Sequence, residues 1–385
     1  MKRAVKVRLY PNKTQQELLQ KHFGAIRYIY NRSLALRKYA YEKFGITISA
    51  NKLIKRLPTL KERHPWLKEI DSQALQQSIR HLDEAFKHFF RRVKNGETPG
   101  FPKFKSKKYS KQSFQYPQRV KIQGKKIYLP KIGWIKAKGL RDDLVGKIKT
   151  VTVSYEAYKY YASILLEIEA EPVKIKRAPI GIDMGVIYAI TDSNGNHHRI
   201  EDYSPRYQKE LVKLEKCQKV LSRKKKGSKR YQKAKIKLAR QHKRVSNIRY
   251  NFLHQISHIY GENQAIVEDL NIKAMTRSAK GTIENPGKNV KAKAALNRKI
   301  LQNGWSLFFE LLAYKTNHNL IKVDPRYTSQ TCSRCGYTDK ENRVTQSRFV
   351  CTSCGFTINA DINAAKNILA RGIHGNNARQ QPKVA

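Results

Sequence analysis

Four cysteines are arranged in two pairs that suit a bound metal ion. Cys332 and Cys335 form one CxxC pair, Cys351 and Cys354 form a second, and 15 residues separate the two. A glycine follows each pair, so each makes a tight turn in which backbone amides can approach the thiolate sulfurs. Four thiolates complete the tetrahedral shell of Zn²⁺ and leave no open position, so we predict one structural zinc ion. Reduced free cysteines are the alternative.

Acidic residues also stand beside apolar segments at three distant points. Asp183 lies within the apolar run 178–190, Glu268 and Asp269 end another apolar run, and Asp361 precedes the helix-like segment 362–368. A charge in an apolar segment costs free energy unless something compensates it. Carboxylate oxygens are the ligands of hard divalent cations, and two such ions can hold the attacking and leaving oxygens of a phosphodiester displacement. These acids are therefore candidates for a metal-dependent hydrolytic site.

Each acid also has a simpler interpretation. Asp183 could accept backbone amides in a tight turn, Glu268 could be a surface acid at a strand end, and Asp361 could be a plain helix N-cap. Glu268 and Asp269 point to opposite sides of a strand, so only one of them can join a cluster. Spacing alone does not show that the three acids meet in space.

The elements of the first half predict a sheet interrupted by helices. Residues 1–10 alternate like a strand, and the pattern from Thr14 to Glu17 resembles a capping box that opens a helix. The chain stays helical to about residue 95, with a last helix capped by Asp71 or Ser72. Strands are expected at 126–129, 147–154 and 160–169, forming a small antiparallel barrel. Because strand 1–10 has no partner nearby, we expect it to join this barrel.

The second half alternates between strands and helices. The run 178–190 predicts one strand, which a turn at 193–195 folds into a hairpin, and 264–270 predicts another. Residues 205–261 are expected to form two long basic helices broken near 226–228, and residues 300–320 an amphipathic helix. The chain beyond about residue 373 is polar and is expected to be a loose tail.

Composition restricts the class of partner. The 385 residues predict two to four domains, and 79 Lys and Arg against 29 Asp and Glu give a net charge of +50. Hydrophobic residues make up 40%, enough to bury cores, so a wholly disordered basic protein is excluded. A net charge this large makes the chain repel itself unless a polyanion neutralises it, which favours nucleic acid over a small molecule as the binding partner. The sequence has no run of 18 apolar residues, so no membrane span is expected. The paired cysteines and the lack of an apolar signal segment predict a cytoplasmic location.

Two surfaces are candidates for nucleic-acid contact. Residues 206–249 carry 18 Lys and Arg but two Glu, which favours a phosphate-binding surface over a merely solvated face. At the break between the two basic helices lie Lys224, Lys225 and Lys226. On the helix that starts near residue 71, one polar face opposite the apolar stripe could pair with base edges, because amides suit adenine and Arg suits guanine. That face consists of Gln73, Gln76, Gln77 and Arg80, and a solvated helix face is its alternative.

Several motifs together resemble the TnpB (OrfB) proteins of insertion sequences, RNA-guided DNA endonucleases related to type V CRISPR effectors. The specific ones are GIDMG at 181–185, VEDL at 267–270, TSQTCSRCG at 328–336, CTSCG at 351–355 and NADINAAKNI at 359–368. Weaker ones are VRLYPN at 7–12, FKHFF at 86–90 and GFPKFKSK at 100–107. The resemblance covers nearly the whole chain.

The resemblance implies a multidomain α+β fold. It implies a wedge β-barrel from 1–10 and 101–172 and a helical recognition lobe, 11–100, inserted in that barrel. It further implies a RuvC-like α/β nuclease domain on the RNase H fold from 173–326 and 357–372, interrupted by a zinc ribbon at 327–356, with a tail at 373–385. It makes Asp183, Glu268 and Asp361 the metal-binding triad, holding two catalytic Mg²⁺ beside the one structural Zn²⁺.

The activity implied is RNA-guided cleavage of DNA for a transposable element. A guide RNA would pair with one strand of double-stranded target DNA beside a short transposon-associated motif, inside a prokaryotic cell at the nucleoid, with no membrane or small-molecule partner. Two alternatives stay open. A non-cleaving RNA-guided DNA-binding regulator is disfavoured because all three acids are present. A guide-independent transposase or resolvase with an RNase H core would purify free of RNA.

Overall fold

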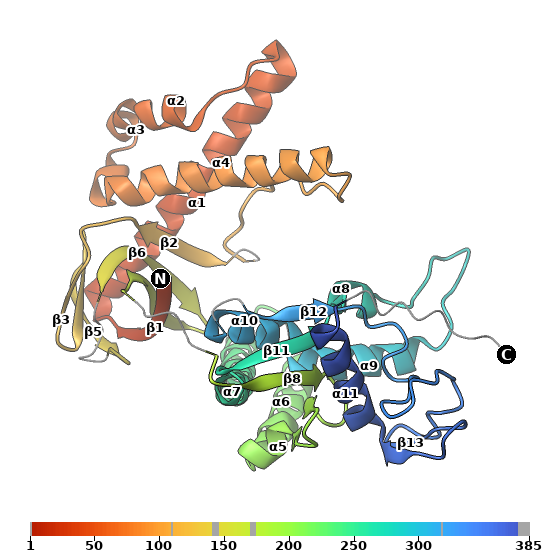
Figure 1. The fold of residues 1–385 in the computed structure, drawn as a ribbon. Coiled ribbons are helices and arrows are strands. Elements are labelled where there is room, and N and C mark those ends of the chain that lie inside the picture. The colour runs from red at the N-terminus through yellow and green to blue at the C-terminus, as the bar shows by residue number, and fades with distance from the viewer. Residues whose placement is uncertain (1, 109–110, 141–145, 170–174, 317–318, 376–385) are drawn as a thin grey trace. The chain divides into compact units, whose positions relative to one another are not determined.

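The computed structural model describes residues 2–108, 111–140, 146–169, 175–316 and 319–375. The chain forms two compact units, Met1–Ala170 and Glu171–Ala385, each with its own apolar core (Figure 1). Both units combine helices with a sheet, so the expected multidomain α+β fold is confirmed. Most of the expected tail, 376–385, lies outside the described residues.

The first unit contains one antiparallel sheet of seven strands. Its strands, in chain order, are β1 (Lys2–Tyr10), β2 (Gln112–Tyr116), β3 (Lys121–Gln123), β4 (Lys126–Leu129), β5 (Gly133–Lys138), β6 (Lys147–Glu156) and β7 (Lys159–Glu167). The order across the sheet is β2-β6-β7-β1-β5-β4-β3. β1 therefore pairs with strands more than 120 residues away in sequence, and its alternation buries Val7 and Leu9. Where a barrel was expected, the pairing among the described residues runs from β2 to β3 without closing.

Helices form the rest of the first unit. They are α1 (Lys13–Phe44), α2 (Ala50–Lys55), α3 (Leu57–Arg63), the 3₁₀ turn η1 (Pro65–Glu69) and α4 (Ser72–Lys94). The expected start of α1 at a Thr14 capping box is wrong by two residues. Asn12 is the N-cap, and its side chain and that of Gln15 each accept a hydrogen bond from the other's backbone N–H. α4 is capped by Asp71 and buries the expected stripe through Leu75, Ile79 and Leu82.

The second unit is built on a mixed sheet of five short strands. They are β8 (Arg177–Asp183), β9 (Ile190–Asp192), β10 (His197–His198), β11 (Asn263–Glu268) and β12 (Ile321–Val323), in the order β10-β9-β8-β11-β12. β8, β11 and β12 are parallel, whereas β9 and β10 are antiparallel to their neighbours. The single strand expected over 178–190 is wrong, because β8 ends at Asp183 and β9 begins at Ile190. Asp183 thus stands at the end of a strand.

Helices cover both faces of this sheet. The helices of the second unit are α5 (Ile200–Tyr203), α6 (Tyr207–Ser222), α7 (Lys229–Ile259), α8 (Ile272–Met275), α9 (Val290–Asn303), α10 (Trp305–Lys315) and α11 (Ala360–Ile373). α7 and α10 share a core with Ile180, Ile182 and Val267, whereas Ile368 of α11 packs with Ile266 on the opposite face. Figure 1 shows α11 lying across the sheet beside β8. No described helix is long and apolar enough to cross a membrane.

The helix expected over 300–320 is divided in two. Gly304 has a φ of +71°, a backbone conformation that glycine adopts readily and L-amino acids rarely do, and it ends α9 before α10 begins at Trp305. The expected pair of basic helices is α6 and α7, and Ser228 caps the second by accepting from the backbone N–H of Tyr231.

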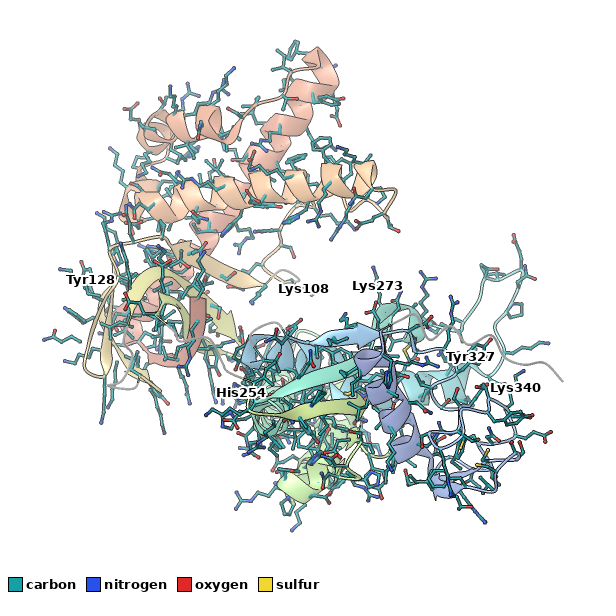
Figure 2. The ribbon with its side chains drawn as sticks, viewed as in Figure 1. Lys108, Tyr128, His254, Lys273, Tyr327 and Lys340 are labelled. Atoms are coloured by element: carbon teal, nitrogen blue, oxygen red, sulfur yellow. The ribbon has the colours of Figure 1, made fainter. Side chains whose placement is uncertain are left out.

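A small segment between β12 and α11 carries the cysteine pairs. Its hairpin consists of β13 (Arg348–Val350) and β14 (Thr357–Asn359). Its apolar core is limited to Cys332, Phe349, Cys351 and Ala360. Tyr327 and Lys340 in Figure 2 mark the beginning and the middle of this segment, which we call the ribbon (residues 327–356).

Candidate functional site

Strand register brings two of the predicted acids together. β8 and β11 are parallel, with Ile182 beside Val267, so Asp183 and Glu268 are the next residues on adjacent strands. Adjacent strands lie about 4.8 Å apart. Side chains alternate along a strand, and Ile182 and Val267 face α7 and α10, so both acids point to the face covered by α11.

The side chains of Glu268 and its neighbour Asp269 point to different sides of the strand, as expected. Glu268 is 9% exposed, and its Oε1 accepts a hydrogen bond of 2.6 Å from the hydroxyl of Thr328. Asp269 is largely exposed and pairs with Lys322 at 2.9 Å. Only Glu268 therefore faces the other acids.

Asp361 comes to the same face because α11 lies very close to β8. Asn359 is the N-cap of α11, accepting from the backbone N–H groups of Asp361 and Ile362, so the interpretation of Asp361 as a plain N-cap is wrong. Its carboxylate is directed instead towards the turn after β8, where an added Cβ on Gly185 would lie 3.7 Å from Asp361 Oδ2. The ribbon residue Arg343 pairs with Asp361 Oδ1 at 3.2 Å.

The three carboxyl groups interact electrostatically. Burial raises the pKa of Asp183 well above its usual value, and the charges of Glu268 and Asp361 raise it further. Burial also raises the pKa of Glu268, against the hydrogen bond from Thr328, and that of Asp361, against the positive charge of Arg343. Acids held together in this way ionise readily only when cations accompany them. Carboxylate oxygens suit Mg²⁺. Among the described residues, the ligand oxygens of these three acids do not all lie within 4.8 Å of one another, so they do not form one compact site for a single ion.

Close contact between β8 and α11 places these acids, and a glycine permits it. A Cβ on Gly181 would lie 2.1 Å from the backbone oxygen of Ala365. We predict that Gly181→Ala pushes α11 away from β8, lowers the stability of the second unit by about 1–3 kcal/mol, and reduces any activity of the acidic site. The same change at Gly24 in α1, where an added Cβ meets no atom within 4 Å, should not destabilise the protein. Thermal unfolding measures both, and equal melting temperatures for the two variants would contradict the prediction.

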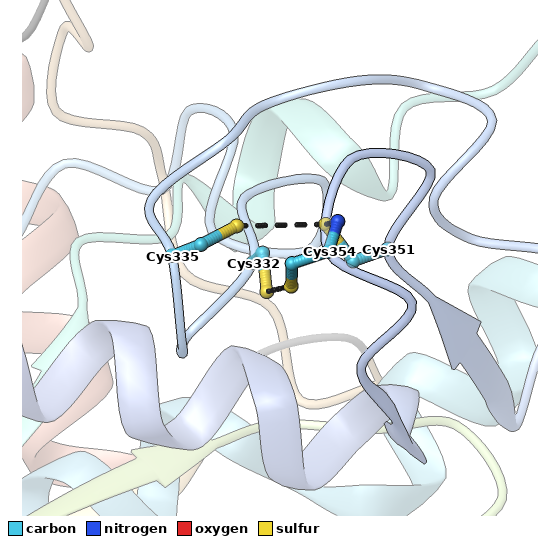
Figure 3. A group of neighbouring side chains, drawn as sticks. All are labelled: Cys332, Cys335, Cys351 and Cys354. Atoms are coloured by element: carbon cyan, nitrogen blue, oxygen red, sulfur yellow. Dashed lines mark hydrogen bonds between the residues drawn. The ribbon is translucent and has the colours of Figure 1, made fainter.

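The four cysteines form the tightest potential metal site. In the part of the chain that the structure describes, they are the one group of three or more His, Cys, Asp or Glu whose ligand atoms all lie within 4.8 Å of one another. Figure 3 shows the four side chains converging, with Sγ atoms 3.8 Å apart for Cys332 and Cys354 and 3.6 Å for Cys335 and Cys351. A tetrahedron with Zn–S bonds of about 2.3 Å has edges of about 3.8 Å. The group therefore fits a structural zinc ion.

One of these thiols is prepared to ionise. The backbone N–H of Phe356, helped by the neighbouring cysteines, lowers the pKa of Cys354 to about 7. Because the thiolate is the zinc ligand, this cysteine can bind without a large cost for losing its proton.

The residues predicted to contact nucleic acid lie at the surface of the unit to which each belongs. Gln73, Gln76, Gln77 and Arg80 are partly or fully exposed on α4. Gln73 accepts from Arg119, and Gln77 contacts His81. The other candidates, Lys224, Lys225 and Lys226, are exposed in the turn between α6 and α7.

Comparison with known proteins identifies the family. Family models described as "Helix-turn-helix domain", "Probable transposase" and "Cas12f1-like, TNB domain" match residues 1–45, 163–279 and 305–368. The provisionally named RNA-guided DNA endonuclease InsQ of Escherichia coli K12 is 40% identical over 379 residues, covering 96% of this chain and 92% of that protein. The chain belongs to the OrfB/TnpB family. In this member, the residues matched by the helix-turn-helix model form β1 and the single long helix α1.

Two further proteins resemble parts or the whole of this OrfB/TnpB chain. The CRISPR-associated endodeoxyribonuclease Cas12f1 of Sulfoacidibacillus thermotolerans is 44% identical over 79 residues, covering 19% of this chain and 18% of that protein. The structure of the mini-RNA-guided endonuclease CRISPR-Cas_phi3 aligns with a TM-score of 0.52 at 11% identity, covering 98% of this chain and 93% of that one. At this level of identity, the likeness concerns the fold alone.

Sequence reasoning did not find the residues of this OrfB/TnpB protein that hold its acids in place. Thr328, Arg343 and Asn359 each bond to the side chain or backbone of a candidate site acid. Thr328 and Asn359 belong to motifs that carried the family resemblance, but their types and spacing do not reveal which acid they contact. Arg343 stands outside those motifs.

Proposed function

We propose that the protein is an RNA-guided DNA endonuclease of a transposable element. The observation that carries this is the gathering of Asp183, Glu268 and Asp361, from β8, β11 and α11, within a chain of net charge +50. The names of its relatives, RNA-guided DNA endonucleases, support the same activity. The intact acids favour it over a non-cleaving regulator.

The three acids would act as ligands for two Mg²⁺ ions. When bound, these ions neutralise charge at the phosphate, supply a water-derived nucleophile at neutral pH and stabilise the leaving oxygen. The charges of Glu268 and Asp361 both raise the pKa of Asp183, so loss of Asp183 would affect the whole group of acids that would hold the ions. Thr328 and Arg343 hold Glu268 and Asp361. If both strands of the target are cut, this one acidic site would cut them in turn.

Nucleic acid supplies the specificity. Phosphate contacts by surfaces such as Lys224–Lys226 carry no sequence information, so a guide RNA paired with the target strand must provide it. The polar face of α4, with Gln73, Gln76, Gln77 and Arg80, is the proposed reader of a short transposon-associated motif in double-stranded DNA. We place this activity in the prokaryotic cytoplasm, at the nucleoid.

The domain assignment follows the family. The sheet of the first unit, 1–10 and 101–172, serves as the wedge, and the helices of 11–100 as the recognition lobe. The mixed sheet with α11, 173–326 and 357–372, serves as the RuvC-like nuclease. The ribbon, 327–356, is held by one zinc ion, for which the sulfur spacing is suitable.

Expression of the full chain together with its flanking locus tests this function. We expect a discrete RNA to co-purify and the complex to cut DNA that matches the guide, with Mg²⁺ and not with EDTA. Exchanging the guide segment should move cleavage to the newly matched target. A protein that purifies without RNA yet binds specific DNA would instead support a guide-independent transposase or resolvase.

A further inference from the structure

Thr328, in the first turn of the ribbon, touches the acidic site directly. Its side chain is buried, with 2% of the residue exposed, and its hydroxyl lies 2.6 Å from Glu268 Oε1. The same hydroxyl lies 3.0 Å from the backbone oxygen of Pro325. A hydroxyl has one proton, and the shorter contact to a chargeable oxygen is the stronger one.

The backbone around Thr328 is fastened to the helix that carries Asp361. The side-chain amide of Asn367 donates to the backbone oxygens of Thr328 at 2.8 Å and Thr331 at 2.7 Å. Asn363 also donates to Thr331 O, at 2.7 Å. Asn363 and Asn367 both lie on α11, so the Thr328 hydroxyl is held in a fixed relation to Asp361.

The fixed hydroxyl of Thr328 can hold the flexible side chain of Glu268 in one orientation. Glutamate loses side-chain entropy when it is ordered, and a second residue that orders it beforehand removes that cost from metal binding. The bond to Oε1 also leaves Oε2 of Glu268 available to a cation. Within the described part of the chain, no other side chain hydrogen-bonds to Glu268.

We propose that Thr328 is a positioning residue for Glu268, which couples the start of the ribbon to the metal affinity of the acidic site. This rests on the proposed function, in which Glu268 binds Mg²⁺. The competing interpretation is that Thr328 only closes the turn at Pro325, in which case its hydroxyl affects stability and not the metal.

Two substitutions separate these interpretations. Thr328→Val keeps the shape and removes the donor, whereas Thr328→Ser keeps the donor. Two Mg²⁺ concentrations are measured for each variant. The first gives half of the maximal rise in melting temperature of the full chain without nucleic acid. The second gives half of the maximal rate of DNA cleavage. We expect Thr328→Val to raise both by about tenfold or more, and Thr328→Ser to restore the wild-type dependence.

Thr331→Val is the matched control, because that hydroxyl bonds to the backbone oxygen of Tyr327 in the same turn and to the hydroxyl of Thr338, and to none of the acids. It should leave both Mg²⁺ dependences unchanged. A lower melting temperature for Thr328→Val with wild-type Mg²⁺ dependences would overturn the positioning role. Cleavage that survives loss of Asp183 would instead overturn the proposed function, so the two failures are distinguishable.

Discussion

Asp183→Asn is expected to abolish DNA cleavage while leaving guide-RNA binding intact. Asparagine keeps the size of the side chain and removes a charge that would help to hold the proposed cations. If this costs about 4 kcal/mol of transition-state stabilisation, the rate falls about 10³-fold. RNA binding depends on the basic surfaces and should not change. Single-turnover cleavage and a filter-binding assay with the co-purified RNA measure the two properties separately.

Asp269→Asn is the matched control for this experiment. It is the same substitution at an acid adjacent to Glu268, but Asp269 is exposed and paired with Lys322. It should cut at the wild-type rate. Wild-type cleavage by Asp183→Asn would show that the acids are not the site of the reaction.

The same substitution has a consequence for stability. The raised pKa of Asp183 means that the folded, metal-free chain holds this proton more tightly than the unfolded chain does. Its contribution to stability is therefore fully present below the unfolded pKa of about 4 and is lost as the pH rises through the folded pKa. Between those two pKa values, each pH unit removes about 1.4 kcal/mol. Asp183→Asn abolishes this loss, so in EDTA at neutral and higher pH we expect the variant to melt above the wild type.

Magnesium should reverse that order. Ions that bind the folded acids stabilise the wild type by mass action, and the asparagine variant binds them more weakly. Melting temperatures measured across pH, with and without Mg²⁺, test both statements. Identical pH dependences for the two proteins in EDTA would show that Asp183 is not confined with the other acids.

Features set by local sequence were predicted well. Each CxxC pair closes its own turn, and the presence of two such pairs predicted the group of four sulfurs that the structure shows. The apolar stripe of α4 follows directly from helical periodicity. Strand alternation predicted that only one of Glu268 and Asp269 can join the cluster, and the family resemblance selected Glu268, which is the buried one. Each of these inferences needs only a few neighbouring residues.

Features set by contacts between distant segments of the chain were not predicted from the sequence. The apolar run through 178–190 resembles one strand, but the chain turns after Asp183, where a Cβ on Gly185 would lie 2.4 Å from the backbone oxygen of Tyr188. The sequence around Asp361 is compatible with an N-cap, but in the structure Asn359 is the N-cap of α11. The bond from Thr328 to Glu268 spans 60 residues, and no local pattern indicates it.

Cys351→Ser is expected to release the zinc ion and unfold the ribbon. Cys351 is 1% exposed in a core of four residues, too small to order the segment without a metal. Serine is a poor ligand for zinc and leaves three thiolates. We expect zinc to fall from about one per chain to nearly none, and limited proteolysis to begin within 327–356. Metal analysis and mass spectrometry of the fragments give the two results.

The acidic site should fail together with the ribbon, because Thr328 and Arg343 hold two of its carboxylates. Cys351→Ser should therefore need more Mg²⁺ for cleavage as well as lose zinc, whereas Asp183→Asn should keep its zinc and its resistance to proteolysis. Cys217→Ser is the control, since this thiol lies in α6, outside the cysteine cluster. Unchanged zinc content in Cys351→Ser would contradict the four-thiolate site. Zinc loss with wild-type Mg²⁺ dependence would show that the ribbon and the acids are independent, because a ribbon that positions Glu268 and Asp361 cannot unfold without releasing them.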